Sequence, residues 1–137
     1  MALTHIVDTS VITRLRLAPI RAAVEPLAAA GSLARAGIAD LEVGYGARSA
    51  KEWDEASGAL DAFELIETSA DHVRRARQVQ RLLAARHQRG RKVPDLLIAA
   101  AAEANDLAVL HYDADYDRIA RVTGQRAQWV VAAGSVD

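Results

Sequence analysis

The fold of this chain is decided by residues 93–104, which read VPDLLIAAAAEA. Pro94 holds its φ angle at a value suited to a first helical turn, and it has no backbone N–H to leave unpaired. We therefore expect a helix to begin here, with Asp95 in its first turn. The remaining positions are apolar on nearly every side, which predicts a helix buried all round. Asp95 is thus expected at the positively polarised end of a core helix.

Two expected strands end in acidic residues. After the helix, residues 108–112 read AVLHY, which is typical of a short buried strand, and the chain then continues into 113–117, DADYD. The first expected strand, at 3–7, ends at Asp8 in the same way. An acid therefore follows the first strand, and three more follow the strand at 108–112.

Strands alternate with helices along the chain. Further strands are expected at 33–38, 63–67 and 128–131, and further helices at 11–15, 19–30, 41–50, 51–62, 70–89 and 116–122. This alternation predicts an α/β fold, with a central parallel sheet of about five short strands covered by helices on both faces. Nothing resembles a linker or an internal repeat, so residues 1–137 are expected to form one domain.

Several side chains have an expected place in these elements. Asp40 is suited to capping the helix at 41–50, and Ser69 lies among the residues suited to capping the one at 70–89. The periodicity of the latter helix places Val73 on its inner face and leaves His72 at the surface. His111, inside a buried strand, is expected to be a core histidine with its hydrogen bonds satisfied.

The composition limits the possible functions. With 51% hydrophobic residues in 137, the chain can form a real core, and with 4% aromatic residues that core must consist of aliphatic side chains. The absence of cysteine excludes disulfides, thiolate metal ligands and cysteine nucleophiles. Neither a signal peptide nor a span of transmembrane length is present, so we expect a cytoplasmic protein without a membrane partner.

The acids predict a metal site. Asp8 and Asp113 follow strands, and ligands of parallel α/β sheets bind beyond the carboxyl ends of the strands. Asp95 and Glu42 each lie in the first turn of a helix, so four separate segments can converge there. Taken alone, Asp8 suits a helix cap and Asp95 a favourable first-turn charge. Glu42 alone suits a solvated helix position, and Asp113 a loop residue. Together they would repel one another unless a cation held them, and oxygen ligands favour Mg²⁺ or Mn²⁺, which suits phosphodiester hydrolysis.

Four stretches of the chain together resemble one family. The first is a strand followed by Asp8-Thr9-Ser10, and the second is a helical Glu42, 34 residues after Asp8. The others are 93–100, VPDLLIAA, and 110–120, LHYDADYDRIA. In combination they resemble the PIN-domain ribonucleases, specifically the VapC toxins of type II toxin–antitoxin modules, and the resemblance covers essentially the full length.

The resemblance implies a three-layer α/β/α PIN-like domain and a function. It implies a Mg²⁺- or Mn²⁺-dependent endoribonuclease toxin that cleaves a structured RNA such as tRNA or rRNA and so inhibits translation. It also implies a homodimer and neutralisation by a cognate VapB-type antitoxin.

The family's site residues carry over by position. Its acidic quartet falls on Asp8, Glu42, Asp95 and Asp113. The resemblance implies that the three aspartates hold the metal, and that Glu42 either ligates it or orients the attacking water. The small hydroxyl of the family falls on Thr9 or Ser10, and a further acid that some members have near the metal falls on Asp115.

Residues 72–92 contain eight arginines and lysines and no acid. Such a segment can neutralise the phosphates of an RNA backbone, although a solvated basic face is an equally open interpretation. The candidate RNA-binding residues are Arg14, Arg89, Arg91 and Lys92.

Two other classes of function remain open. A phosphatase or phospho-acceptor receiver would use an aspartate nucleophile, but such phosphatases have Asp-x-Asp after the first strand, where this chain has Asp8-Thr9-Ser10. A receiver would need an acceptor aspartate after the third strand, which 65–67, LIE, does not supply. A non-catalytic RNA-binding module would keep the acids without a use, and unpaired clustered carboxylates are electrostatically unfavourable.

Overall fold

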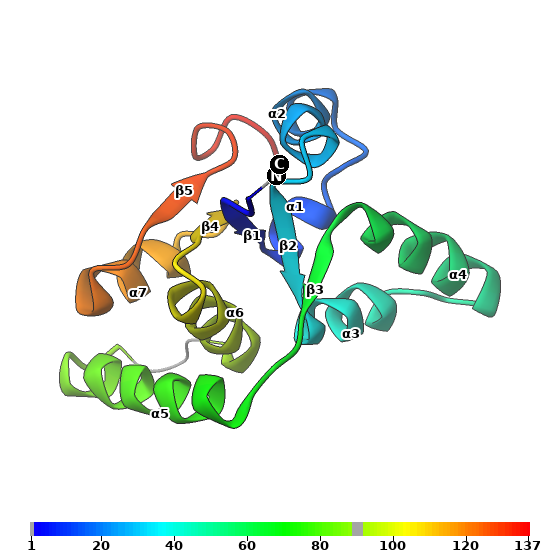
Figure 1. The fold of residues 1–137 in the computed structure, drawn as a ribbon. Helices are drawn as coiled ribbons and strands as arrows, with labels where there is room; N and C mark the ends of the chain where they lie inside the picture. Colours follow the sequence, from blue (N-terminus) through cyan, green and yellow to red (C-terminus); the bar gives the residue numbers. More distant parts are fainter. Residues whose placement is uncertain (1, 89–91) are drawn as a thin grey trace.

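The computed structural model describes residues 2–88 and 92–137, and its centre is a five-stranded sheet in the order β3-β2-β1-β4-β5 (Figure 1). Every pairing between neighbouring strands is parallel. The strands are β1 His5–Val7, β2 Leu33–Ala36, β3 Glu64–Ile66, β4 Ala108–His111 and β5 Ala127–Trp129. The predicted parallel sheet of about five short strands is confirmed.

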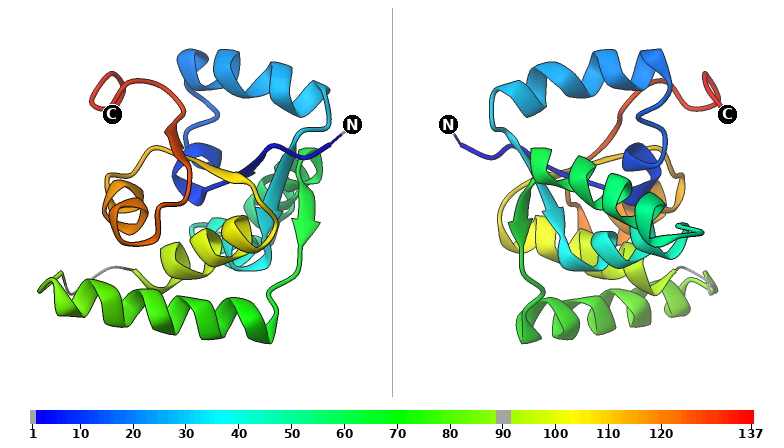
Figure 2. Two further views of the ribbon diagram at one scale, coloured as in Figure 1. Left: turned by 60° about the vertical axis from the view of Figure 1, so that its left-hand side comes forward. Right: turned by 90° about the vertical axis from the view of Figure 1, so that its right-hand side faces the viewer.

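Helices cover both faces of this sheet, which gives the predicted three layers (Figure 2). In the described residues they are α1 Thr9–Ile12, α2 Ala18–Ala29, α3 Gly37–Tyr45, α4 Ala50–Ala59, the 3-10 helix η1 Leu60–Ala62, α5 Ala70–Ala85, α6 Val93–Ala104 and α7 Asp115–Thr123. Figure 1 shows α3 and α4 projecting to one side as an arm. No helix in the described ranges has both the length and the apolar character to span a bilayer.

The sheet separates two hydrophobic cores. Ile6 of β1 and Val109 of β4 face the core formed with α5, α6 and α7. Their neighbours Val7 and Leu110 face the opposite core, formed with α1, α2 and η1. Side chains of a strand point alternately to its two faces, so each of these short strands contributes to both layers.

Helix α6 is buried as its sequence predicts, because it lies between the sheet and α5 (Figure 2). Pro94 lies in its first turn, and the four consecutive alanines 99–102 are each at most 4% exposed. Alanine side chains allow the backbones on both sides to approach closely. The position of Asp95 at the start of this helix is therefore set by the packing of the whole helix.

One predicted helix start and one predicted helix face differ from the structure. Helix α3 begins at Gly37, and Asp40 is in its first turn, where it accepts a hydrogen bond from Nε of Arg35 at 2.7 Å instead of capping the helix. On α5, Ser69 is the cap, but His72 shares a reciprocal capping box with it and is buried. Val73 is 46% exposed as a result. The predicted inner face was therefore wrong at the first turn of α5 and right for the turns that follow.

The packing of α6 predicts that Ala101→Leu destabilises the protein. Ala101 is 1% exposed, and overpacking a filled core lowers the free energy of unfolding by about 1–3 kcal/mol. Ala104→Leu is the matched control, because Ala104 is exposed on the same helix and leucine has nearly the helix propensity of alanine. Urea unfolding followed by circular dichroism measures both. Equal effects at the two positions would contradict the packing described here.

Candidate active site

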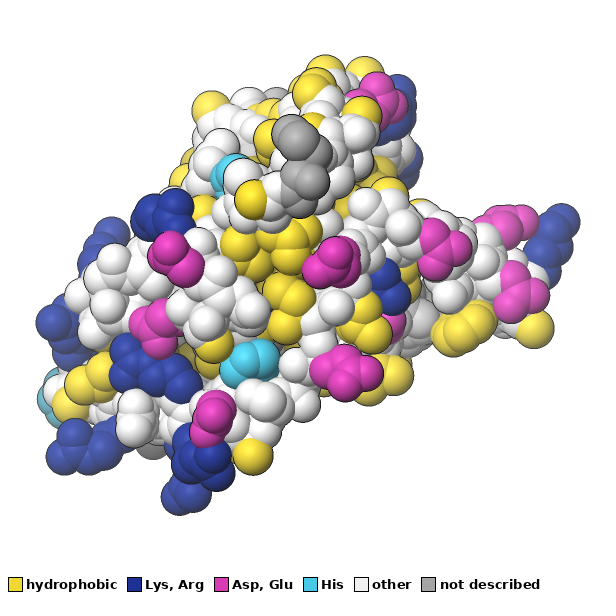
Figure 3. Space-filling model, in the orientation of Figure 1, with side chains coloured by type: hydrophobic (Ala, Val, Ile, Leu, Met, Phe, Trp, Pro, Cys, Tyr) yellow, Lys and Arg dark blue, Asp and Glu magenta, His cyan; other side chains and the backbone are white. Residues whose placement is uncertain are grey.

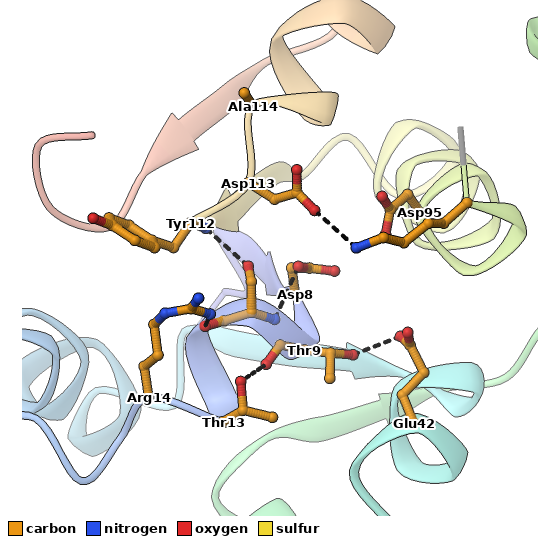
Figure 4. A pocket seen from close by; sticks show the side chains of 11 residues that line it. Asp8, Thr9, Thr13, Arg14, Glu42, Asp95, Tyr112, Asp113 and Ala114 are labelled. Atoms are coloured by element: carbon orange, nitrogen blue, oxygen red, sulfur yellow. Dashed lines mark hydrogen bonds and ion pairs between the residues drawn. The ribbon is translucent and has the colours of Figure 1, made fainter. Parts of the chain in front are cut away.

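A cleft of about 470 Å³ opens at the carboxyl edge of the sheet. Four acids reach it from separate segments: the end of β1, helix α3, the start of α6 and the loop after β4 (Figure 4). The cleft is lined by Asp8, Thr9, Ser10, Thr13, Arg14, Glu42, Lys92, Asp95, Tyr112, Asp113 and Ala114. The structure thus brings together all four acids that the sequence singles out.

Asp8 is held by its own backbone and by two hydrogen bonds to its carboxylate. Its N–H donates to the carbonyl oxygen of Leu110 at 2.9 Å, which continues the pairing of β1 with β4. Its Oδ2 accepts from the N–H of Ser10 at 3.0 Å and caps α1, while Oδ1 accepts from the hydroxyl of Tyr116 at 2.5 Å. The side chain is therefore both a cap and a member of the acidic cleft.

The two hydroxyls after Asp8 have different partners. Thr9 Oγ1 donates to Glu42 Oε1 at 2.7 Å, and Ser10 Oγ accepts from the N–H of Tyr112 at 2.9 Å. Thr9 thereby positions the Glu42 carboxylate, while Ser10 ties α1 to the chain leaving β4. Burial raises the pKa of Glu42, and the nearby charge of Asp8 adds to this effect.

Asp95 is the most strongly perturbed acid of the cleft. Its residue is 3% exposed, and its Oδ2 atom has no hydrogen-bond partner among the described residues. Burial raises the pKa of its carboxyl from 3.8 to about 7, with further contributions from the charges of Asp8 and Asp113. A buried carboxyl with an unpaired oxygen requires either a proton or a cation at neutral pH.

The loop after β4 completes the acidic group. Asp113 Oδ1 accepts from the N–H of Asp115 at 2.9 Å, and Asp113 Oδ2 lies 3.6 Å from Nζ of Lys92. One carboxylate oxygen each of Asp95, Asp113 and Asp115 lies within 4.8 Å of the others. Asp115 also accepts from Arg118 at 3.1 Å.

These residues fit a hard divalent cation. The donor set consists of carboxylate oxygens, and Oδ2 of Asp95 is a buried acceptor that lacks a protein donor. Asp8 is not one of the three acids whose oxygens lie within 4.8 Å of one another, and its own two oxygens accept from Tyr116 and Ser10. The geometry thus favours Asp115 over Asp8 as the third oxygen nearest to Asp95 and Asp113.

Tyr116 is a residue of the site that the sequence motifs did not single out. Tyr116 is 1% exposed, and its hydroxyl lies between Asp8 and Asp95, 3.5 Å from Oδ1 of the latter. In the sequence, its position three residues after Asp113 is the one feature that could have indicated a role in the site. An aromatic residue at that position is equally typical of a helix that packs on a hydrophobic core. The direction of its hydroxyl depends on where α7 lies against β1.

His111 is buried, as expected, but it is not fully satisfied. Its Nδ1 accepts from the N–H of Asp113 at 3.2 Å, whereas Nε2 has no hydrogen-bond partner within the described part of the chain. Burial lowers the pKa of His111, which favours the neutral ring that accepts at Nδ1. The ring packs 5.0 Å from the rings of Tyr116 and Trp129.

Two of the predicted RNA-binding residues lie in the cleft. Lys92 faces the acids, whereas Arg14 donates to the carbonyl oxygens of Ser10 and Asp137, each at 2.8 Å. The Arg14 guanidinium also lies 5.0 Å from the centre of the Tyr112 ring. The other two candidates, Arg89 and Arg91, fall outside the described residues.

The fold and the cleft together define a three-layer α/β/α protein with a cluster of carboxylates at the carboxyl edge of its sheet. Residues 5–122 match the PIN domain family. The chain is 63% identical to Ribonuclease VapC51 of Mycobacterium tuberculosis over the full length of both, and 41% identical to Ribonuclease VapC21 of that organism over 98% of this chain and 99% of the relative. The protein therefore belongs to the PIN domain family.

Solved structures show the same fold at low sequence identity. The DNA-bound VapBC structure from Salmonella typhimurium superposes with a TM-score of 0.77, at 18% identity, covering 94% of this chain and 99% of the other. FitAcB from Neisseria gonorrhoeae superposes with a TM-score of 0.74, at 16% identity, covering 93% and 98%. The likeness shows that these proteins share the fold of this chain.

The hydrogen bond from Tyr116 to Asp8 is expected to stabilise the folded protein. Tyr116→Phe removes the donor to the buried carboxylate of Asp8, so we expect the free energy of unfolding at pH 7 to fall by about 1–3 kcal/mol. Tyr45→Phe is the control, because Tyr45 is 92% exposed. Urea titrations of both variants measure the difference. An unchanged midpoint for Tyr116→Phe would show that the hydrogen bond contributes nothing.

The raised pKa of Asp95 predicts a pH-dependent stabilisation by Asp95→Asn. Between pH 4 and about 7 the folded chain keeps a proton that the unfolded chain loses, so stability falls as pH rises through this window. At pH 8 without metal, Asp95→Asn should raise the free energy of unfolding by about 1–4 kcal/mol. At pH 4 the gain should vanish.

Urea unfolding in EDTA at both pH values checks this expectation. The exposed Asp54 serves as control, and Asp54→Asn should change neither value. A gain that is the same at pH 4 and pH 8 would mean that the charge of Asp95 is not the cause.

Proposed function

We propose that this protein is a Mg²⁺- or Mn²⁺-dependent endoribonuclease. The observation that carries the proposal is the buried Asp95 carboxylate, whose Oδ2 lacks a partner in the described residues while Asp8, Glu42 and Asp113 line the same cleft. Relatives that align over nearly the whole chain are named ribonucleases, which supports the same activity here.

The carboxylates of Asp95, Asp113 and Asp115 would hold the cation, with Asp8 beside them. A divalent cation there would supply Lewis acidity, polarising the scissile phosphate and lowering the pKa of the attacking water. The ring of His111 supports this arrangement because it accepts the backbone N–H of Asp113 and thereby holds the loop after β4.

Glu42 is placed to handle the proton of the attacking water. Thr9 fixes one oxygen of its carboxylate, and its raised pKa moves it towards the neutral range in which a general base is most effective. Tyr116 and Ser10 keep the Asp8 carboxylate in one orientation. The chain's own residues therefore orient the acids and provide a route for the proton.

Basic side chains supply a surface for the RNA backbone. Arginines gather over α5 in Figure 3, and Arg74, Arg77 and Arg81 form an exposed stripe on that helix. Lys92 and Arg14 stand at the cleft itself. Such a distribution favours an extended polyanion, and we propose a structured RNA such as tRNA or rRNA as the target.

The protein would act as the toxin of a toxin–antitoxin pair in the cytoplasm, where cleavage of its target inhibits translation. Similar folds occur in VapBC structures from Salmonella typhimurium and Haemophilus influenzae. A cognate VapB-type antitoxin would neutralise it, with a homodimer as the active unit. An antitoxin helix lying across an apolar groove could bring an arginine or lysine to the acids.

The test is RNA cleavage by Asp95→Asn. Loss of a metal ligand should exceed the 10- to 100-fold effect of residues that only orient ligands, so we expect cleavage in Mg²⁺ to fall by at least about 100-fold. Brief induction followed by sequencing of RNA 5′ ends measures cleavage and identifies the target. Asp54→Asn should cut as the wild type does.

Because Asp95→Asn is expected to be more stable than the wild type at pH 8, its inactivity would not reflect unfolding. Cleavage at the wild-type rate would overturn the proposal. A trapped covalent phosphoenzyme would instead indicate a phosphatase or receiver. RNA binding without cleavage, and without Mn²⁺ binding at millimolar concentrations in calorimetry, would indicate a non-catalytic module.

A further inference from the structure

Lys92 is a basic residue of the cleft whose ammonium lies beside the acidic group of Asp95, Asp113 and Asp115. Its Nζ lies 3.6 Å from Oδ2 of Asp113, the ion pair drawn from Asp113 in Figure 4. Asp95 and Asp115 also interact electrostatically with it, and together with Asp113 they raise the pKa of Lys92, so that the ammonium stays charged. Asp113 thus has Lys92 as its ion-pair partner, while Asp115 is also paired with Arg118 at 3.1 Å.

The two basic residues that line the cleft are bound differently. The Arg14 guanidinium donates to two backbone oxygens at 2.8 Å and lies over the Tyr112 ring. One of the two oxygens belongs to Asp137, so the guanidinium points away from the acids. Among the described residues Lys92 has one ion pair, at 3.6 Å; its side chain is 64% exposed, and it makes no capping hydrogen bond for α6. Lys92 can therefore leave the acids without breaking the fold.

A divalent cation and this ammonium compete for the same carboxylate. Asp113 is one of the three acids whose oxygens lie within 4.8 Å of one another, and it is also the ion-pair partner of Lys92. Two cations at one carboxylate repel each other at this distance. The exposed ammonium of Lys92 would then move towards the solvent side of the cleft, where the phosphates of a bound RNA would lie.

We propose that Lys92 is the resident cation of the metal-free cleft and becomes a phosphate-binding residue for RNA once a divalent ion displaces it. This inference rests on the proposed function, since it assumes a metal-dependent ribonuclease site. It predicts that one substitution has opposite effects on two ligands: removal of the charge strengthens metal binding and weakens RNA binding.

The metal arm of the test needs no RNA. Calorimetric titration with Mn²⁺ should show about three- to tenfold tighter binding to Lys92→Met than to the wild type, because the competing charge is gone while the apolar stem is kept. Lys92→Arg should stay within about twofold of the wild type. The control is Lys51→Met, since Lys51 is the chain's other lysine and lies exposed on α4, outside the cleft.

The RNA arm uses a labelled transcript of the target identified by 5′-end sequencing. At saturating Mg²⁺, Lys92→Met should raise KM about five- to tenfold and leave kcat within about twofold. The plot of log(kcat/KM) against log salt should become shallower by about 0.7–0.9, the slope of one lost phosphate contact. Lys92→Arg should restore both values, which a purely structural role of the lysine stem would not explain.

The outcomes separate this inference from the proposed function. Wild-type protein that binds no Mn²⁺ at millimolar concentrations overturns the metal site itself. Mn²⁺ binding that is equal in the wild type and Lys92→Met overturns the resident-cation role while the ribonuclease proposal stands. Tighter Mn²⁺ binding with unchanged KM and salt slope overturns the transfer of Lys92 to the RNA.

Discussion

The parallel pairing of β1 with β4 is the constraint on which the site depends. Val7 pairs with Leu110, and the N–H of Asp8 extends the pairing by one more hydrogen bond to Leu110. Both strands therefore release the chain at the same edge, one into Asp8 and the other into Asp113. Helix α6, packed between the sheet and α5, brings Asp95 to the same edge. Neighbouring strands and one buried helix thus place carboxylates from distant parts of the chain in a single cleft.

This arrangement opposes the electrostatic preference of the acids. Burial raises the pKa of Asp95 to about 7 and also raises that of Glu42, so the metal-free cleft is not at an electrostatic minimum near neutral pH. The aliphatic packing of α6 and the β1–β4 pairing keep the acids in place. The hydroxyl of Tyr116 and the ammonium of Lys92 offset part of the repulsion. The burial and mutual repulsion of these carboxylates, which lower the stability of the folded chain, would also favour binding of a cation.

Local patterns were enough to predict the layers and most of the elements. Pro94 and the alanine tract predicted a buried α6, and the acids after β1 and β4 were expected at one edge because parallel strands share a direction. The predictions for single side chains failed where two local hydrogen-bonding partners were available to the same side chain. Asp40 pairs with Arg35 across the turn into α3 instead of capping, and His72 turns inward because it completes the capping box with Ser69. The energies of such alternatives differ too little for a sequence pattern to decide between them.

Hydrophobic periodicity and helix-start chemistry act over a few neighbouring residues, so the amino-acid sequence was enough to predict most strands and helices and to place Asp8, Asp95 and Asp113 at their ends. Glu42 was expected in the first turn of its helix but lies further along α3, which begins at Gly37. Only the tertiary structure decided how those acids are held. Tyr116 lies 108 positions from Asp8, and Thr9 lies 33 positions from Glu42, so their hydrogen bonds exist only once the layers are packed. Packing between distant segments also decides that Lys92 pairs with the acids while Arg14 donates to the backbone of Asp137. Contacts between distant segments depend on the packing of whole helices against the sheet, which no short stretch of sequence contains.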